Sequence, residues 1–318
     1  MSLVINPDPR SLWKSFPSDQ GGAYPKTDEE AHHVEGFGRR LIGASKRGRS
    51  HAHVGSFRDD DFVVRADDRT GWHIVAVADG AGSAKCSRKG SSLAVGASVD
   101  FVSLELAGGA AESIELAVSD WLLDGLAVPS ADTKRISDLL YRLLGGAAHE
   151  AVKAIQRECE AAKRPYRDYS TTLILAIHKR ISGREFIAAY WVGDGGVGVF
   201  SKENETVKVL GDGDCGEFAG QTRFLDASMI QGKEIVDRLR FTAVETFTTL
   251  ILMTDGVTDP KFETDKNLRD PVYWEKLWDE LSLSFLGTDV SNPEAALLSW
   301  LNFDSPGNHD DRTIVVVS

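Results

Sequence analysis

Residues 58–80 read RDDDFVVRADDRTGWHIVAVADG, and this stretch decides the fold. Two apolar runs, Phe62–Arg65 and Trp72–Ala78, flank a polar turn, which is the pattern of two strands joined in a hairpin. In an antiparallel hairpin, the residue before the first strand lies beside the residue after the second. Asp60 and Asp79 are therefore expected to be neighbours. Adjacent carboxylates are unfavourable unless one is protonated or a cation lies between them, and we favour the cation.

Further aspartates occupy the ends of apolar runs. Asp255 and Asp194 each follow such a run and precede glycine, as Asp79 does, and Asp310 precedes the run 313–317. A single Asp-Gly is most often a turn, but the joint placement of these residues indicates a site. Oxygen ligands suit Mg²⁺ and Mn²⁺, and a pair of such ions activates water for phosphoryl displacement. The residues predicted to bind metal are Asp60, Asp79, Asp255, Asp310 and, through its backbone carbonyl, Gly80.

The amino-acid composition limits the classes of protein to which this chain can belong. A chain of 318 residues can bury a substantial core, and we favour one folded domain. The formal net charge of -12 argues against a nucleic-acid or anionic membrane surface. Cys86, Cys159 and Cys215 form no C-x-x-C pair, so we expect reduced thiols. No apolar run approaches the ~20 residues of a membrane helix and no signal peptide is evident, so a cytoplasmic location is expected.

The pattern of residues along the chain predicts α+β layering, with sheet packed on sheet and helices outside. Residues 1–38 are rich in Pro, Gly, Ser and charge, and they are expected to form a loosely ordered N-terminal extension before a domain of residues 39–318. Apolar residues at helical spacing predict helices at 87–102, 110–126, 136–162, 272–285 and 293–301. Strands are predicted at 41–45, 62–65, 72–78, 172–177, 186–192, 197–200, 207–210, 248–253 and 313–317.

The acidic motifs occur in an order that resembles the metal-dependent PPM or PP2C-type serine/threonine protein phosphatases. They are the strand entry at Asp60, V-A-D-G at Asp79, V-G-D-G at Asp194, T-D-G-V-T-D at Asp255 and D-D-R-T at Asp310. Five motifs in order between residues 41 and 318 are not expected by chance. The D-G-A-G-S turn at 79–83 and the stretch 216–222 are similar to a bacterial subgroup.

This resemblance implies a four-layer αββα sandwich of two antiparallel sheets flanked by helices, with two metal ions in the cleft between the sheets. Asp79 would bridge the ions, Asp255 and Asp310 would bind one of them, and Asp60 would lie near the other. Asp194 would help to hold a weaker third ion. The family hydrolyses phosphoserine and phosphothreonine in proteins by direct attack of metal-activated water. Mg²⁺ or Mn²⁺, phosphorylated protein substrates and a cognate kinase are thus implied, without nucleic-acid or membrane partners.

The chain departs from the family pattern where phosphate would bind. The arginine that usually precedes the first acidic pair is absent at its usual spacing, where His51 stands. We assign phosphate contact to His51, with Arg58 and Arg49 as competing candidates whose guanidinium groups suit phosphate better. Ala81 replaces the histidine that many relatives carry after the second motif, so His51 is also the candidate general acid. The interval 196–254 is short for the family's helical flap.

Other polar residues receive structural interpretations. Asp311 is expected to cap backbone N–H groups, and Asp59 and Asp61 are expected to be solvated loop charges. His51 and His53 alternate as residues of a strand would. The missing arginine and Ala81 leave open a noncatalytic metal-binding module that recognises phosphoproteins, a pseudophosphatase. A two-metal nuclease has suitable ligands, but the negative charge opposes binding of a polyanion.

Overall fold

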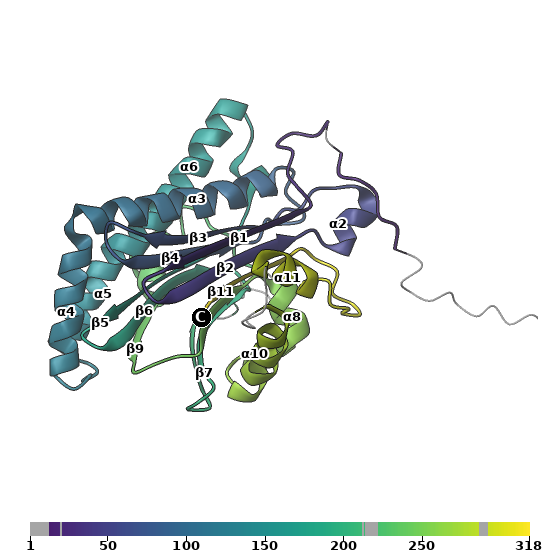
Figure 1. The fold of residues 1–318 in the computed structure, drawn as a ribbon. Helices are drawn as coiled ribbons and strands as arrows, with labels where there is room; N and C mark the ends of the chain where they lie inside the picture. The colour runs from purple at the N-terminus through teal and green to yellow at the C-terminus, as the bar shows by residue number, and fades with distance from the viewer. Residues whose placement is uncertain (1–12, 20, 212, 214–221, 286–291) are drawn as a thin grey trace, which may run out of the picture.

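The computed structural model describes residues 13–19, 21–211, 213, 222–285 and 292–318. Two antiparallel sheets pack between two groups of helices, which confirms the predicted four-layer αββα sandwich (Figure 1). The first sheet has the order β1 (Glu29–Gly36), β2 (Arg39–Lys46), β11 (Arg312–Val317), β10 (Thr249–Met253), β7 (Gly196–Ser201) and β8 (Thr206–Gly211). The second has the order β3 (Asp61–Asp67), β4 (Trp72–Ala78), β5 (Leu173–Ile181), β6 (Arg184–Val192) and β9 (Leu239–Val244).

Three apolar clusters hold these layers together. Side chains such as Phe62 and Leu250 fill the space between the sheets. The second sheet is covered on its outer face by α3 (Ser87–Glu105), α4 (Ala111–Leu123), α5 (Ala131–Leu140) and α6 (Gly146–Ala162). The first sheet is covered by α8 (Asp255–Phe262), α9 (Asp265–Leu268), α10 (Pro271–Phe285) and α11 (Pro293–Trp300). Strand β4 is buried at every position because both faces of its sheet are covered, which explains its continuous apolar run.

The strand directions bring the acidic motifs to one end of the sandwich. Asp61 lies opposite Ala78 in the β3–β4 hairpin, so Asp60 and Asp79 flank the same end, as the sequence predicts. Strands β4 and β6 are both antiparallel to β5, so Asp194 follows β6 at this end as well. In the other sheet, β10 and β11 are antiparallel, and the end that they share carries Asp255 and Asp310.

The expectation of a loosely ordered segment through residue 38 is wrong for Glu29–Gly36, which form the edge strand β1. This strand pairs with β2 from Glu29 opposite Lys46 to Gly36 opposite Arg39, so the expected domain boundary falls inside a hairpin. The guanidinium of Arg39 pairs with Glu185 of the other sheet at 3.1 Å. The strand is charged and only partly buried, so it lacks the apolar alternation by which strands are identified.

Other differences come from irregular or short elements. The single helix predicted at 136–162 is divided by a π-helical turn, Tyr141–Gly145, between α5 and α6. Strand β9 was not predicted, although its residues 239–243, Leu-Arg-Phe-Thr-Ala, alternate between apolar and polar. His51 and His53 lie on the helix α2 (Arg49–Val54) and not on a strand. Of the stretch 216–222, only Thr222 lies within the described residues.

The helical stretch Ser87–Leu123 is long and apolar enough, by length and composition alone, to cross a membrane. The sequence analysis expected no apolar stretch of this length, and by length and composition that expectation is wrong. The buried side chains of the stretch, among them Val99, Ile114 and Val118, belong to the core that packs on the second sheet. Core helices of globular proteins pass the same test, so the stretch is weak evidence for a membrane span.

Candidate metal centre

Carboxylates from both sheets converge at the acidic end of the sandwich. Asp79 follows β4, Asp194 follows β6 and Asp255 begins α8, and these three residues each offer an oxygen within 4.8 Å of the others. Asp60 is fully buried beside them, and its Oδ2 accepts a hydrogen bond from the Thr254 hydroxyl at 2.8 Å. The sequence prediction that these motifs lie together is therefore confirmed for Asp79, Asp194 and Asp255.

The electrostatics of the cluster fit a bound cation. Burial, reinforced by Asp311, raises the pKa of Asp60 to about 7. Burial also raises the pKa of Asp79 well above its usual range, with Asp60 and Asp255 adding to the effect. The Oδ1 atoms of Asp60, Asp194 and Asp255 are buried and have no hydrogen-bond partner. Hard divalent cations take oxygen ligands of this kind, so the donor set fits Mg²⁺ or Mn²⁺.

Threonines that the sequence interpretation missed hold Asp79 in place. The Asp79 N–H donates to the Thr172 hydroxyl at 2.8 Å. The Asp79 carbonyl accepts from the Thr172 N–H at 2.8 Å and from the Thr171 hydroxyl at 2.9 Å. With its backbone bound on both sides, Asp79 has its position set before any metal arrives. The sequence feature that could have identified this role is the pair of adjacent threonines directly before β5.

Gly80 is required by close backbone packing. A Cβ atom at this position would lie 2.6 Å from the Asp59 carbonyl oxygen and 2.9 Å from Ser87. Gly80 lies opposite Thr171 in an antiparallel bridge. The hydrogen bonds of this bridge are made by the neighbouring residues, from the Thr172 N–H to the Asp79 carbonyl and from the Ala81 N–H to the Ser170 carbonyl. The Gly80 carbonyl oxygen is therefore not used in the bridge, in keeping with its prediction as a metal ligand.

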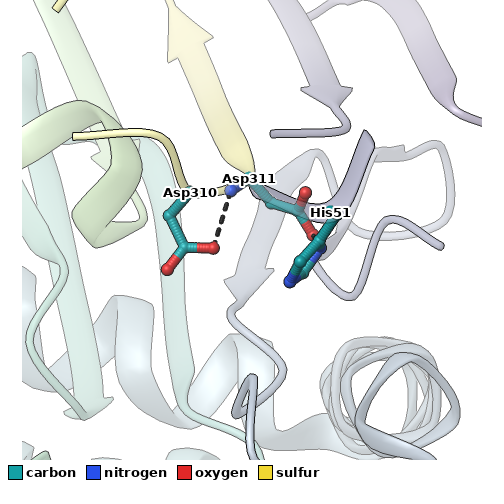
Figure 2. A group of neighbouring side chains, drawn as sticks. All are labelled: His51, Asp310 and Asp311. Atoms are coloured by element: carbon teal, nitrogen blue, oxygen red, sulfur yellow. Dashed lines mark hydrogen bonds and ion pairs between the residues drawn. The ribbon is translucent and has the colours of Figure 1, made fainter. Parts of the chain in front are cut away.

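Asp310 and Asp311 play different roles (Figure 2). Asp310 is exposed, and its Oδ1 accepts the Asp311 N–H at 2.8 Å. The Asp311 side chain is buried and accepts the N–H groups of Gly48 at 2.6 Å and Asp59 at 2.5 Å, which confirms its predicted role as a backbone cap. The Asp311 carboxylate also pairs with His51, at 3.0 Å between Oδ2 and Nδ1, a contact that the sequence did not predict.

His51 is a charged group beside the acidic cluster. Burial lowers its pKa, but the contact with the Asp311 carboxylate outweighs burial and gives a pKa of about 9. His51 is therefore an imidazolium at neutral pH, with its ring oriented by Asp311 (Figure 2). His51, Asp310 and Asp311 also offer ligand atoms within 4.8 Å of one another, but a protonated imidazole has no lone pair for a metal, so His51 is not a ligand in this charge state.

Arg58 does not have the role that the sequence suggested. Its side chain is fully buried, where it donates to Glu30 Oε2 at 2.5 Å and to the Thr27 carbonyl at 3.2 Å. A guanidinium held in this way anchors the chain around β1 and is not available to a phosphate. Arg49, the other candidate, is partly exposed and pairs with Asp304 at 3.0 Å.

The flanking aspartates are not solvated, contrary to the sequence expectation. Asp59 and Asp61 are both buried. Asp61 pairs with the Lys26 ammonium at 2.8 Å, and Lys26 also donates to the Asp60 carbonyl at 2.6 Å. The segment before β1, which sequence composition placed in the loose extension, therefore supplies the counter-charge for this loop.

We expect the acidic cluster to contribute more stability to the metal-free protein as pH falls from about 7 toward 4, while His73 and His178, whose pKa values are lowered by burial, oppose this change below about 6.5. The pKa values of Asp60, Asp79 and Asp255 are raised in the folded state, so protonation favours that state. Their stabilising contribution is complete below the unfolded pKa and is lost as pH rises through the folded pKa, which is about 7 for Asp60. Urea unfolding at pH 5 and pH 7.5 measures this change.

Mn²⁺ should remove most of that pH dependence, because a cation stabilises the ionised carboxylates. At one hundred times its dissociation constant, a bound ion adds about 3 kcal/mol to the free energy of unfolding. The comparison is made at pH 7.5 with Mn²⁺ and with EDTA. Equal unfolding free energies in the two conditions would contradict a metal centre at these residues.

Comparisons with known proteins agree with this architecture. The family model described as protein phosphatase 2C matches residues 47–302. Serine/threonine phosphatase Stp1 from Staphylococcus aureus is similar in structure, with 14% identity, a TM-score of 0.51, and coverage of 91% of this chain and 98% of that chain. The catalytic domain of serine/threonine phosphatase PstP in complex with two manganese ions has 17% identity, a TM-score of 0.50, and coverage of 88% and 97%. These likenesses show a shared fold. No curated protein matches the sequence significantly.

Proposed function

Because the chain belongs to the protein phosphatase 2C family, we propose that it is a metal-dependent phosphatase acting on phosphoserine and phosphothreonine in proteins. The observation that carries this proposal is the convergence of Asp79, Asp194 and Asp255, together with unpartnered buried oxygens in the same cluster. The PstP structure contains two manganese ions, which supports a two-ion centre of Mg²⁺ or Mn²⁺ here. The ligands would be Asp60, Asp79, Gly80, Asp255 and Asp310, with Asp194 holding a weaker third ion.

Two divalent cations at this site would supply a water of lowered pKa and positive charge beside the phosphoryl oxygens. Around that centre, Thr171 and Thr172 hold the Asp79 backbone, and Thr254 orients the Asp60 carboxylate. His51 is charged and fixed by Asp311, so it is suited to contact the phosphate. Its imidazolium can also donate a proton to the leaving alkoxide of serine or threonine.

The proposal extends to partners and location. Phosphorylated proteins, including the targets of a cognate serine/threonine kinase, are the proposed substrates, and the proposed location is the cytoplasm. A negative net charge and the absence of a strongly basic composition support protein substrates in preference to nucleic acids.

The test is hydrolysis of p-nitrophenyl phosphate and a phosphothreonine peptide by the full chain. We expect turnover of both in Mn²⁺ and loss of both in EDTA. A noncatalytic phosphoprotein-binding module is the second candidate, and the burial of Arg58 away from phosphate favours it. Peptide binding in Mn²⁺ without turnover of either substrate would establish that alternative and overturn the enzyme.

A further inference from the structure

A cavity of about 290 Å³ is lined by both basic and acidic side chains. Asp310, a predicted metal ligand, forms part of its wall, whereas Asp60, Asp79, Asp194 and Asp255 do not line it. The start of α2 forms another part, and α2 also carries His51. The charged residues that line the cavity are Lys46, Arg47, Arg49, Arg312, Asp28, Glu29 and Asp310.

Two of the cations are neutralised within the cavity wall. Lys46 pairs with Glu29, and Arg47 pairs with Asp28 at 3.0 Å. Arg47 also donates to the carbonyl oxygens of Ser56 and Phe16, which fixes it as part of the wall. The positive charge available to a ligand therefore comes from Arg49 and Arg312.

Arg312 is a buried cation without an ion pair among the described residues. Its side chain donates from Nη1 to the carbonyl oxygens of Leu301 at 2.7 Å and Phe303 at 2.5 Å, and the guanidinium lies 3.9 Å from the Phe303 ring centroid. Burial, with Arg49 nearby, lowers the pKa of Arg312, and the Asp304 carboxylate acts in the opposite direction without forming a direct ion pair among the described residues. Charged groups are seldom buried in proteins without an opposite charge, so this one is suited to an anionic ligand.

Arg49 supplies a second guanidinium to the same cavity. It is partly exposed and pairs with Asp304 at 3.0 Å, a partly exposed contact that a ligand can replace at small cost. Arg49 and His51 both lie on α2 but have different partners, since Arg49 pairs with Asp304 and His51 with Asp311, so a group bound at Arg49 would lie apart from a phosphate held by His51. A substrate peptide that carries a second acidic group could place its phosphate at His51 and that second group at Arg49.

We propose that Arg312 and Arg49 form an anion subsite for an acidic group of the phosphoprotein next to the phosphorylated residue. The group is a carboxylate of Asp or Glu or a second phosphate, because both offer oxygens to the forked donors of arginine. This inference rests on the proposed function, since it assigns a substrate preference to the same centre. The negative charge of Asp310 in the cavity wall would repel an anion, and a cation bound to Asp310 would weaken that repulsion.

The test uses three phosphothreonine peptides that differ only at the flanking positions, which carry glutamine, glutamate or phosphoserine. Wild type should favour the glutamate peptide over the glutamine peptide by about tenfold in kcat/KM, mostly through KM, as expected for a charged hydrogen bond. The phosphoserine peptide separates a phosphate subsite from a carboxylate subsite. Arg312→Gln and Arg49→Gln should each bring the preference close to one, and Arg312→Lys should keep part of it.

Arg65→Gln is the matched control, because Arg65 lies on β3 and pairs with Asp100 of α3 away from the cavity wall. It should keep the full preference. Arg312→Gln can fail to fold because it loses two carbonyl contacts, but Arg49 is partly exposed and its variant tests the subsite independently. No preference in wild type, or an unchanged preference in Arg49→Gln, would overturn the subsite.

The subsite can also be tested if the protein turns over no substrate. In that case the same peptides are titrated into the Mn²⁺-loaded protein and their binding is followed by fluorescence anisotropy. The expected result is about tenfold tighter binding of the glutamate peptide, lost in Arg49→Gln. Equal affinities would refute the subsite, whereas failure of turnover alone refutes only the enzyme.

Discussion

Replacing Asp79 with asparagine should lower Mn²⁺-dependent kcat/KM toward p-nitrophenyl phosphate on the order of 10³-fold or more. Asp79 lies among Asp60, Asp194 and Asp255, and its backbone is fixed by Thr171 and Thr172. An amide keeps the shape of the side chain but removes the charge that holds cations. The measurement is steady-state hydrolysis in Mn²⁺, with metal content determined on the same sample.

Asp138→Asn is the matched control. Asp138 is exposed on α5, and its side chain forms an ion pair with Lys134 of the same helix. This control should keep wild-type activity. In EDTA, Asp79→Asn should unfold at a urea concentration no lower than wild type, because it removes one of several crowded negative charges. Near wild-type turnover by Asp79→Asn would place catalysis elsewhere.

Gly256→Ala should destabilise the protein by about 3 kcal/mol or more, or prevent folding. A Cβ atom at Gly256 would overlap the Asp311 carbonyl oxygen, which belongs to the backbone at the start of β11 and cannot rotate away. The clash would separate Asp255 from Asp310 and thereby open the metal centre. Urea unfolding followed by circular dichroism measures the loss.

Gly96→Ala provides the comparison for this substitution. Gly96 lies inside α3, and a Cβ atom there would meet no other atom within 4 Å. Alanine is favoured over glycine in a helix, so this variant should gain up to about 1 kcal/mol. If Gly256→Ala unfolded at the same urea concentration as wild type, the close packing of Gly256 against Asp311 would be refuted.

The acidic cluster was predictable because it depends on local sequence and strand direction. Apolar runs that end in aspartate identify strand ends, and antiparallel pairing then places those ends together. The hairpin of Asp60 and Asp79 follows from residues 58–80 alone. Edge strand β1 was missed for the opposite reason, since a charged and half-exposed strand carries little of the apolar periodicity on which prediction depends.

The sequence by itself determined the α+β sandwich, its acidic strand ends and their convergence. Only the tertiary structure decided which charges are paired. It placed Arg58 against Glu30 and His51 against Asp311, and it left Arg312 beside a cavity without an ion pair among the described residues. These pairings join residues far apart in sequence, through side-chain directions that no local pattern specifies. Strand ends follow from periodicity, whereas the partner of a buried charge follows from packing in three dimensions.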